Sequence, residues 1–193
     1  MSKVIPDLEN IIVQYLDIDD YSKIIKYNPK LYSWQKYFAG KLPTIYDAIN
    51  IYDNLHLVKY IIKKNNKNIN YDQIIFRSIP VAKYVTKKIP LSPVEDDMEY
   101  ESLISETIKS GNPELLKFIL GLKIYHLDTT LYYEIFESAF YANVSLENIK
   151  ILFAFAKENL KYDFANLIAE VYTLADLIAS EEIKIYIKFL SSY

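Results

Sequence analysis

Few side chains in this sequence are suited to catalysis or metal binding, and their spacing argues against both. The chain contains two histidines, His56 in "NLHLVKY" and His126 in "KIYHLDTT", and no cysteine. A catalytic zinc ion takes three protein ligands, so two distant histidines without a cysteine predict no zinc site, even with Asp128 close to the second. We therefore expect His56 to be a structural residue at the surface or in a turn.

The acidic stretch "VEDDMEYE" at 94–101 is the other place where a cation could gather. It lacks the glycine-containing twelve-residue pattern of a calcium loop, so we interpret it as a solvated acidic loop. With only three glycines, the chain also contains none of the glycine-rich phosphate-binding or nucleophile motifs. The sequence predicts a protein without enzymatic activity, metal or cofactor.

The overall composition is that of a globular protein in a reducing compartment. Of the 193 residues, 51% are apolar and 24% are charged, which is sufficient for one domain or two small ones. No apolar run approaches the length of a transmembrane helix, and the N-terminal "MSKVIPDLENIIV" does not resemble a secretory signal. Together with the absence of cysteine, these features predict a cytoplasmic or nuclear protein with no membrane partner.

The charge pattern argues against a nucleic-acid partner. The formal net charge is −3, the 22 basic residues are scattered, and arginine occurs once, as Arg77. Nucleic-acid binding depends largely on grouped basic side chains that neutralise phosphates, and the densest basic stretch, "KKNNKN" at 63–68, is short. We predict that the chain does not bind nucleic acid.

Helical periodicity dominates the chain and predicts an all-α fold. Residues 1–43 contain three expected helices: "LENIIVQYL", a short "YSKIIKY" capped by Asp20, and "KLYSWQKYFAGKL" after Asn28 and Pro29. Residues 44–193 consist of expected helix pairs. The pairs are 44–52 with 55–64, 99–110 with 113–121, 131–142 with 145–158, and 164–178 with 180–190. Between the first and second pairs lie a shortened segment at 71–88 and a loop with two prolines at 89–100.

One short pattern recurs through the paired region. The stretch "NPELLKFI" at 112–119 is similar to four other stretches of the chain: "NLHLVKYI" (54–61), "SIPVAKYV" (78–85), "SLENIKIL" (145–152) and "ASEEIKIY" (179–186). When the five are aligned on their lysine, the lysines are 24, 34, 33 and 34 residues apart. Three nearly equal intervals indicate an internal repeat with one helix pair per unit. The aligned lysines are Lys59, Lys83, Lys117, Lys150 and Lys184.

This period and the two helices per unit resemble the ankyrin repeat. The second ankyrin helix begins in a style like G-[HN]-x-[ED]-[VI]-[VL]-K-x-L-[LI], which "GNPELLKFIL" follows closely, and "KKNNKNINYD" is similar to the loop that leaves each unit. The T-P-L-H tetrapeptide and most of the glycines are absent. The resemblance implies an α-solenoid of about four to five degenerate units, namely 44–70, 71–98 (abbreviated, with an inserted loop), 99–130, 131–163 and 164–193.

Two other helical arrays fit the sequence less well. A tetratricopeptide array has a similar period, but its Trp/Leu-Gly/Tyr pattern is absent. A HEAT-like unit is usually longer. In the ankyrin-like alignment the lysine faces solvent, and four apolar residues face the neighbouring units: Leu115, Leu116, Ile119 and Leu120.

Residues 5–38 resemble an F-box. Ile5-Pro6 stands in the place of the leading Leu-Pro, Tyr15-Leu16 closes the first helix, and Trp34 follows further on, although "YNPKLY" replaces the usual Cys/Asn-Lys-Arg centre. An alternative is a unit that caps the first repeat. The F-box resemblance implies that six residues dock the small adaptor that joins F-box proteins to a cullin ubiquitin ligase: Ile5, Pro6, Leu8, Ile12, Leu16 and Trp34.

The whole chain resembles ankyrin/F-box proteins of giant DNA viruses of protists, Mimiviridae-like or related. The shared features are the F-box-like start, the degenerate repeats and a composition rich in tyrosine, isoleucine, lysine and asparagine. The resemblance implies a non-enzymatic adaptor in the host cytoplasm that binds a host or viral protein along the concave face of its repeats. A second hypothesis is a structural protein of the virion or viral factory that assembles with itself and has no ubiquitin role.

Tyrosine is abundant, with 19 in the chain. Exposed tyrosines make good interface anchors because they offer a large contact area at low entropic cost. We expect Tyr15, Tyr60 and Tyr84 to be core or half-core residues, and we expect the edges of the repeats to carry Tyr71, Tyr125, Tyr132 and Tyr133.

Overall fold

The computed structural model describes residues 16–27, 29, 32–65, 69–89, 97–122, 127–160 and 162–192. Within these ranges the secondary structure consists of α-helices and one short 3-10 helix, with no β-strand, so the predicted all-α class is confirmed. The chain divides into two compact units, residues 1–68 and 69–193.

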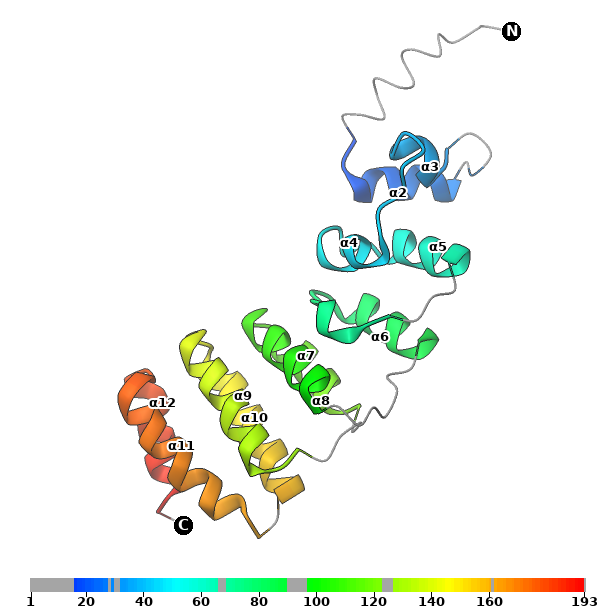
Figure 1. Cartoon of the computed structure of the whole chain (residues 1–193). Helices are drawn as coiled ribbons and strands as arrows, with labels where there is room; N and C mark the ends of the chain where they lie inside the picture. The colour runs from blue at the N-terminus through cyan, green and yellow to red at the C-terminus, as the bar shows by residue number, and fades with distance from the viewer. Residues whose placement is uncertain are drawn as a thin grey trace, which may run out of the picture. The chain divides into compact units, whose positions relative to one another are not determined.

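The first unit contains four described helices, and their order along the chain is seen in Figure 1. They are α2 (Ile18–Tyr27), α3 (Trp34–Tyr37), α4 (Ile45–Asn50) and α5 (Leu55–Asn65). The pair α4 and α5 agrees with the expected helices at 44–52 and 55–64, and these two helices pack against each other. Thr44 and Asp47 form a reciprocal capping box that fixes the start of α4.

Two expectations for the N-terminal helices are corrected. The carboxylate of Asp17, rather than that of Asp20, accepts a hydrogen bond from a backbone N–H of the first turn of α2, that of Asp20, at 2.8 Å. The third expected helix is only α3, and Ser33 caps it by accepting from the backbone N–H of Lys36 at 3.3 Å. Because Ser33 provides the cap, α3 begins at Trp34 instead of directly after Pro29.

Aromatic rings cluster at α2 and α3 in the first unit, while aliphatic side chains such as Ile49 and Leu57 are buried on α4 and α5. Trp34 and Tyr21 are 1% and 0% exposed, and their ring centroids lie 5.9 Å apart. Tyr37 packs on Tyr21 at 4.6 Å, and Phe38 packs on Tyr37 at 4.9 Å. Asn54 connects α5 to α2, because its amide donates to the carboxylate of Asp19 at 2.7 Å.

The second unit contains one 3-10 helix and seven described α-helices. The segment at 71–88 provides η1 (Tyr71–Gln73) and α6 (Ile79–Lys88). The acidic loop expected at 89–100 is shorter than predicted, because α7 already begins at Asp97, and residues 90–96 lie outside the described ranges. The other helices are α7 (Asp97–Lys109), α8 (Pro113–Leu120), α9 (Thr129–Tyr141), α10 (Leu146–Leu160), α11 (Phe164–Ile178) and α12 (Glu181–Leu190).

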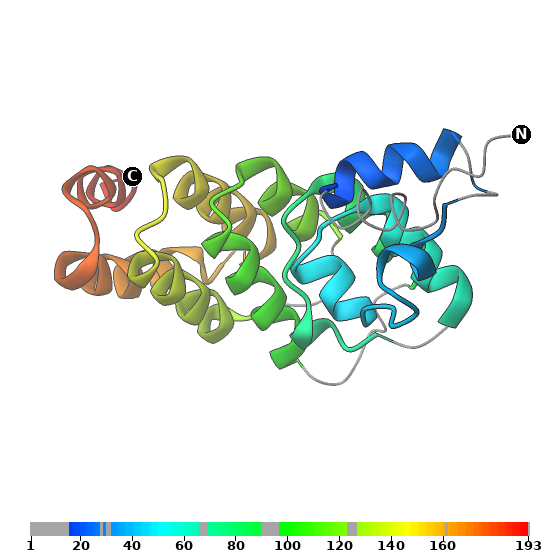
Figure 2. The same cartoon turned by 90° about the horizontal axis from the view of Figure 1, so that it is seen from above.

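The helices of the second unit lie in two rows, as Figure 2 shows. The first helix of each pair packs against the first helix of the next, so α7 contacts α9 and α9 contacts α11. The second helices do the same, in the order α6, α8, α10 and α12. Within each pair the two helices also contact each other, so the core lies between the rows.

The aligned lysines occupy one equivalent place on five helices. Lys59, Lys83, Lys117 and Lys150 are exposed, and Lys184 is partly exposed. Two of them lie over a ring of the next second helix: Lys83 is 5.8 Å from the centre of Phe118, and Lys150 is 5.4 Å from that of Tyr186. The residue directly before each lysine is buried, at 0–2% exposure, in all five helices: Val58, Ala82, Leu116, Ile149 and Ile183.

Three of the four turns between paired helices, all except the one between α11 and α12, share a backbone feature. Asp53, Gly111 and Asn143 adopt positive φ angles of 45°, 70° and 49°, in the turns before α5, α8 and α10. Glycine, asparagine and aspartate are the residues that tolerate this left-handed conformation best. The best-preserved pattern, α8, then starts with Asn112 as its cap and Pro113 in its first turn. Leu115, Leu116, Ile119 and Leu120 are all at most 1% exposed, as the sequence predicts.

Candidate functional site

The residues of the F-box-like pattern fall mostly outside the described ranges. Ile5, Pro6, Leu8 and Ile12 lie there, and only Leu16 and Trp34 are described. Leu16 is half-buried, and its carbonyl accepts a hydrogen bond from the hydroxyl of Tyr37 at 3.1 Å. Trp34 is a core residue of the first unit, so its side chain supports the neighbouring helices and does not present a free surface to a partner.

His56 lies against this aromatic core. Its ring centroid is 5.7 Å from that of Trp34, and its Nδ1 is buried without a hydrogen-bond partner among the described residues. Burial lowers the pKa of His56, and the positive charges of Lys59 and Lys26 lower it further. Burial therefore disfavours the charged imidazolium. The ring has the structural role expected from the sequence, but it is half-buried in the first turn of α5 and not at the surface or in a turn.

The described residues contain no cluster of side chains that could bind a metal ion. No three histidine, aspartate or glutamate side chains among them are placed to bind one ion. His126 lies outside the described ranges, as does most of the acidic stretch at 94–101. The carboxylate of Asp128, next to the second histidine, caps α9 by accepting from the backbone N–H of Leu131 at 2.9 Å.

The structure shows how deeply each described tyrosine named in the sequence analysis is buried. Tyr60 and Tyr84 are half-buried, in agreement with the expected half-core role. Tyr71 and Tyr132 are core residues at 3% and 0% exposure, so neither is available as an exposed anchor at a repeat edge. Tyr133, the neighbour of Tyr132 on α9, is half-buried and lines a surface groove. Tyr15 and Tyr125 lie outside the described ranges.

That groove runs between α9 and α11 on the first-helix row of the second unit. It has a volume of about 440 Å³ and is lined by Thr130 and Tyr133 from α9 and by Glu170 and Thr173 from α11. The hydroxyl of Thr173 donates to the backbone carbonyl of Ala169 at 3.1 Å, which leaves its oxygen able to accept. We refer to these four residues as the α9–α11 groove.

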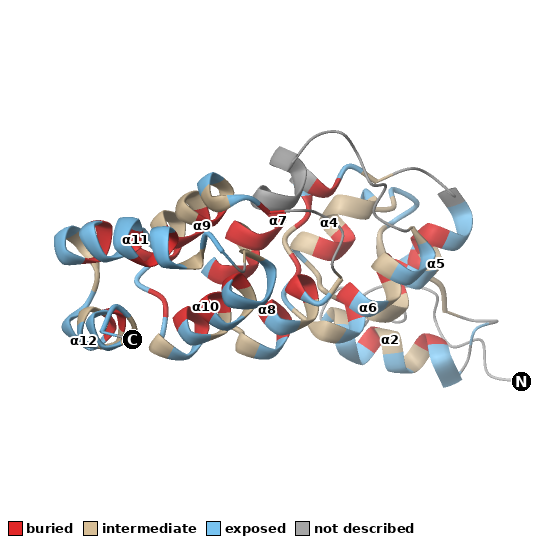
Figure 3. Cartoon of the chain, turned by 90° about the horizontal axis from the view of Figure 1, so that it is seen from below, coloured by how far each residue is buried: buried red, intermediate tan, exposed pale blue. Residues whose placement is uncertain are grey.

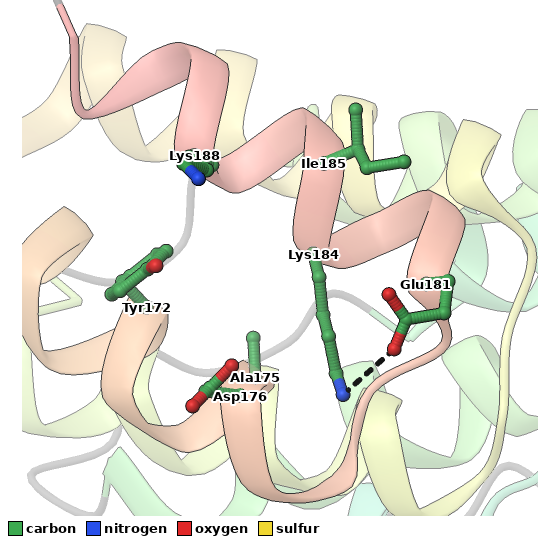
Figure 4. A pocket seen from close by; sticks show the side chains of 7 residues that line it. All are labelled: Tyr172, Ala175, Asp176, Glu181, Lys184, Ile185 and Lys188. Atoms are coloured by element: carbon green, nitrogen blue, oxygen red, sulfur yellow. Dashed lines mark hydrogen bonds and ion pairs between the residues drawn. The ribbon is translucent and has the colours of Figure 1, made fainter.

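A second, smaller hollow of about 210 Å³ lies between α11 and α12 (Figure 4). Tyr172 and Asp176 line it from α11, and Glu181, Lys184 and Lys188 line it from α12. The ammonium of Lys184 lies 3.1 Å from the carboxylate of Glu181, as the dashed line in Figure 4 marks. This hollow therefore contains charges of both signs, and one of its lysines is already paired.

The last helix pair also exposes several large apolar side chains. Figure 3 shows long exposed stretches on α11 and α12. Leu177 is 77% exposed, and Ile185 and Phe189, which are one helical turn apart on α12, are 68% and 56% exposed. Large apolar side chains that stay exposed on adjoining helices are typical of surfaces that contact another molecule.

The comparisons with known proteins yield no relative. No family model matches the chain, and no curated protein or solved structure matches it significantly. Within the part of the chain that the structure describes, no helix combines the length and the apolar character needed to cross a membrane. The site must therefore be interpreted from its own residues.

Sequence reasoning identified one residue of the α9–α11 groove, Tyr133, and missed Thr130, Glu170 and Thr173. The missed signal is compositional. The expected helices at 131–142 and 164–178 contain no lysine, arginine or histidine, whereas each of their partner helices contains lysines.

Proposed function

We propose that this protein is a non-enzymatic protein-interaction module built as an α-solenoid of degenerate ankyrin-like helix pairs. The observation that carries the proposal is the repeated burial pattern around the five aligned lysines. Helix pairs that pack only on their neighbours leave an extended surface along each row, and repeat proteins use such surfaces to bind partners. A host or viral protein held on the first-helix row is the function that this arrangement supports best.

The test is affinity purification of the tagged full-length chain, followed by mass spectrometry and by binding of the purified partner. We expect one recovered protein to bind directly, and we expect Tyr133→Ala to weaken that binding about tenfold, because half-buried aromatic residues often anchor interfaces. The matched control is Tyr27→Ala, at a tyrosine that is 84% exposed on α2. The proposal fails if no recovered protein binds directly.

The first unit carries a second part of the proposal, namely that it recruits a cullin ubiquitin ligase through an F-box-like segment. Leu16 and the residues before it would contact the adaptor, and Trp34 would stabilise the first unit by packing in its core. In titration calorimetry with the purified adaptor, we expect Pro6→Ala and Leu16→Ala each to reduce affinity about tenfold. Unchanged binding by both variants would contradict the F-box role and favour the alternative that this segment only caps the first repeat.

A structural, self-assembling viral protein is the alternative function. It is favoured by the exposed Leu177, Ile185 and Phe189 on the last helix pair. Light scattering decides between the two. An oligomer that persists on dilution, and that becomes a monomer in the Ile185→Asp and Phe189→Asp variants, supports self-assembly, whereas a monomeric wild type rules it out.

A further inference from the structure

The two helix rows of the second unit differ in charge where the last two pairs lie. Helices α9 and α11, in the first-helix row, contain no lysine, arginine or histidine. Their partner helices α10 and α12 contain lysines and glutamates in equal number. The carboxylates on α9 and α11 are Glu134, Glu137, Glu170 and Asp176, and the charged residues of α10 and α12 are Glu147, Lys150, Lys157, Glu158, Glu181, Glu182, Lys184 and Lys188.

The α9–α11 groove combines this negative charge with an aromatic wall. Tyr133 is half-buried and lines the groove from α9, and Glu170 is exposed and lines it from the neighbouring helix α11. Thr130 and Thr173 add hydroxyl oxygens that accept hydrogen bonds. An aromatic ring, a carboxylate and hydroxyl acceptors form the environment that a lysine or arginine side chain prefers, since its stem packs on the ring and its charged end meets the oxygens.

The same chemistry extends along both helices beyond the hollow. On α9, Glu137 follows Tyr133 by four residues, and on α11, Leu177 follows Thr173 by four residues. Residues four apart lie on one face of a helix, so the face with the groove continues with another carboxylate and an exposed apolar side chain. A binding segment with several basic residues and an apolar one would match this face along its length.

The hollow between α11 and α12 provides a contrast within the same unit. There Lys184 lies 3.1 Å from Glu181, and Lys188 adds a second positive charge (Figure 4). Because Asp176 and Glu181 are offset there by Lys184 and Lys188, that hollow offers no net negative charge to attract a basic segment. Neither α9 nor α11 supplies a cation that would compete for Glu170 in the α9–α11 groove.

We infer that the α9–α11 groove binds a basic segment of a partner protein, with a lysine or arginine side chain inserted between Tyr133 and Glu170. The inference rests on the proposed protein-binding function and names the chemistry of the partner. Charge complementarity selects the occupant, and the aromatic ring and the volume of about 440 Å³ provide room for the side chain.

The experiment measures binding of a fluorescent peptide that alternates arginine and alanine to the full-length chain, by anisotropy at low and moderate salt. The peptide also carries a photo-crosslinker, so that mass spectrometry identifies the contacted helices. A peptide with glutamine in place of arginine reports binding without charge. Three variants are compared with the wild type: Glu170→Gln, Tyr133→Ala, and the control Glu182→Gln, which makes the same charge change at an exposed position on α12.

We expect the arginine peptide to bind, to crosslink to α9 or α11, and to weaken as salt rises. Glu170→Gln should reduce its affinity about threefold to fivefold, as for an exposed charge pair, and Tyr133→Ala about tenfold. Glu182→Gln should change the affinity less than twofold, since it removes a charge from the other row. Glu170 is exposed, so its substitution leaves the fold intact.

Three results would overturn the inference: equal weakening by Glu170→Gln and Glu182→Gln, equal binding of the glutamine peptide, or no binding of the arginine peptide. Binding of the affinity-purified partner distinguishes failure of this inference from failure of the proposed function. Suppose that the purified partner binds the wild type but not Tyr133→Ala, and that the arginine peptide does not bind. The proposed protein-binding function then stands, and the preference for basic segments is rejected.

Discussion

The two units of this protein build their cores in different ways. In the first unit, Trp34, Tyr21 and Tyr37 form one cluster of rings, with His56 at its side. In the second unit, mainly aliphatic side chains fill equivalent positions on successive helices, as Leu116 and Ile149 do before their lysines. The ring cluster of the first unit occurs once, whereas the buried position before the aligned lysine recurs on four helices of the second unit and, as Val58, on α5 of the first.

This difference predicts how each core responds to the removal of a buried side chain. In a cluster of rings, each aromatic residue touches several others, so removal of one leaves a large cavity at the centre of the unit. In stacked helix pairs, each side chain contacts only its own pair and the neighbouring pairs, so the loss of one side chain affects mainly those pairs. Four experiments test the comparison.

Trp34→Ala should have the largest effect. Loss of a fully buried indole costs about 3–5 kcal/mol in unfolding free energy. In hydrogen exchange measured by mass spectrometry, we expect protection to fall throughout residues 16–65 and to persist in the helices after residue 103. Tyr27→Ala, at an exposed ring, is the control. An equal loss of protection in both units would contradict the comparison.

Leu116→Ala should cost about 2–5 kcal/mol, because Leu116 is 0% exposed and the cavity opens inside the stacked helices. The measurement is urea denaturation followed by circular dichroism. Leu177→Ala makes the same chemical change at a side chain that is 77% exposed and should cost less than about 0.5 kcal/mol. Similar losses for the two variants would mean that Leu116 does not belong to the recurring core.

Asn148→Leu should stabilise the protein by about 1 kcal/mol. Asn148 is 0% exposed, and neither its amide nitrogen nor its carbonyl oxygen has a hydrogen-bond partner among the described residues. The aligned place on α8 is occupied by Leu115, so a leucine fits the repeat. Thermal unfolding measures the change, and Asn166→Leu, at an exposed position, is the control. A lower melting temperature would show that the buried amide is paired in solution.

The smallest expected effect is a dependence of stability on pH through His56. Its pKa is lowered in the folded protein, mainly by burial, so the unfolded chain takes up the proton first as pH falls. Stability is therefore unaffected well above the unfolded pKa of about 6.5 and is lost as pH falls through that value toward the folded pKa. His56→Gln should flatten this part of the melting profile, and His126→Gln is the control. A profile unchanged by His56→Gln would assign the pH dependence to other groups.

The sequence predicts the recurring unit better than the aromatic unit, for a physical reason. Helical periodicity and the lysine register report on contacts that recur, so α9 (Thr129–Tyr141) and α10 (Leu146–Leu160) begin within two residues of their expected positions. The length of α3 depends on the cap at Ser33 and on how Trp34 packs in a core without repetition. Such long-range contacts leave no periodic signal along the chain.

The groove was predictable only in part. Tyr133 was identifiable as a tyrosine near a repeat edge, but Tyr132 beside it has the same residue type and is fully buried. Which of two adjacent tyrosines faces outward depends on the rotation of α9 against its neighbours. The absence of basic residues from both helices was visible in the sequence, but it becomes informative only when packing places Glu170 close to Tyr133.

The positive φ angles of Asp53, Gly111 and Asn143 have a consequence for how the gene can change. Codons for glycine, aspartate and asparagine can be connected by single guanine-to-adenine substitutions, from GGT to GAT and from GAT to AAT. All three residues accept the left-handed backbone, so a coding sequence that gains adenine and thymine can lose its glycines one nucleotide at a time. A turn between paired helices can therefore change its residue type by single-nucleotide steps and still carry a residue that tolerates the positive φ angle.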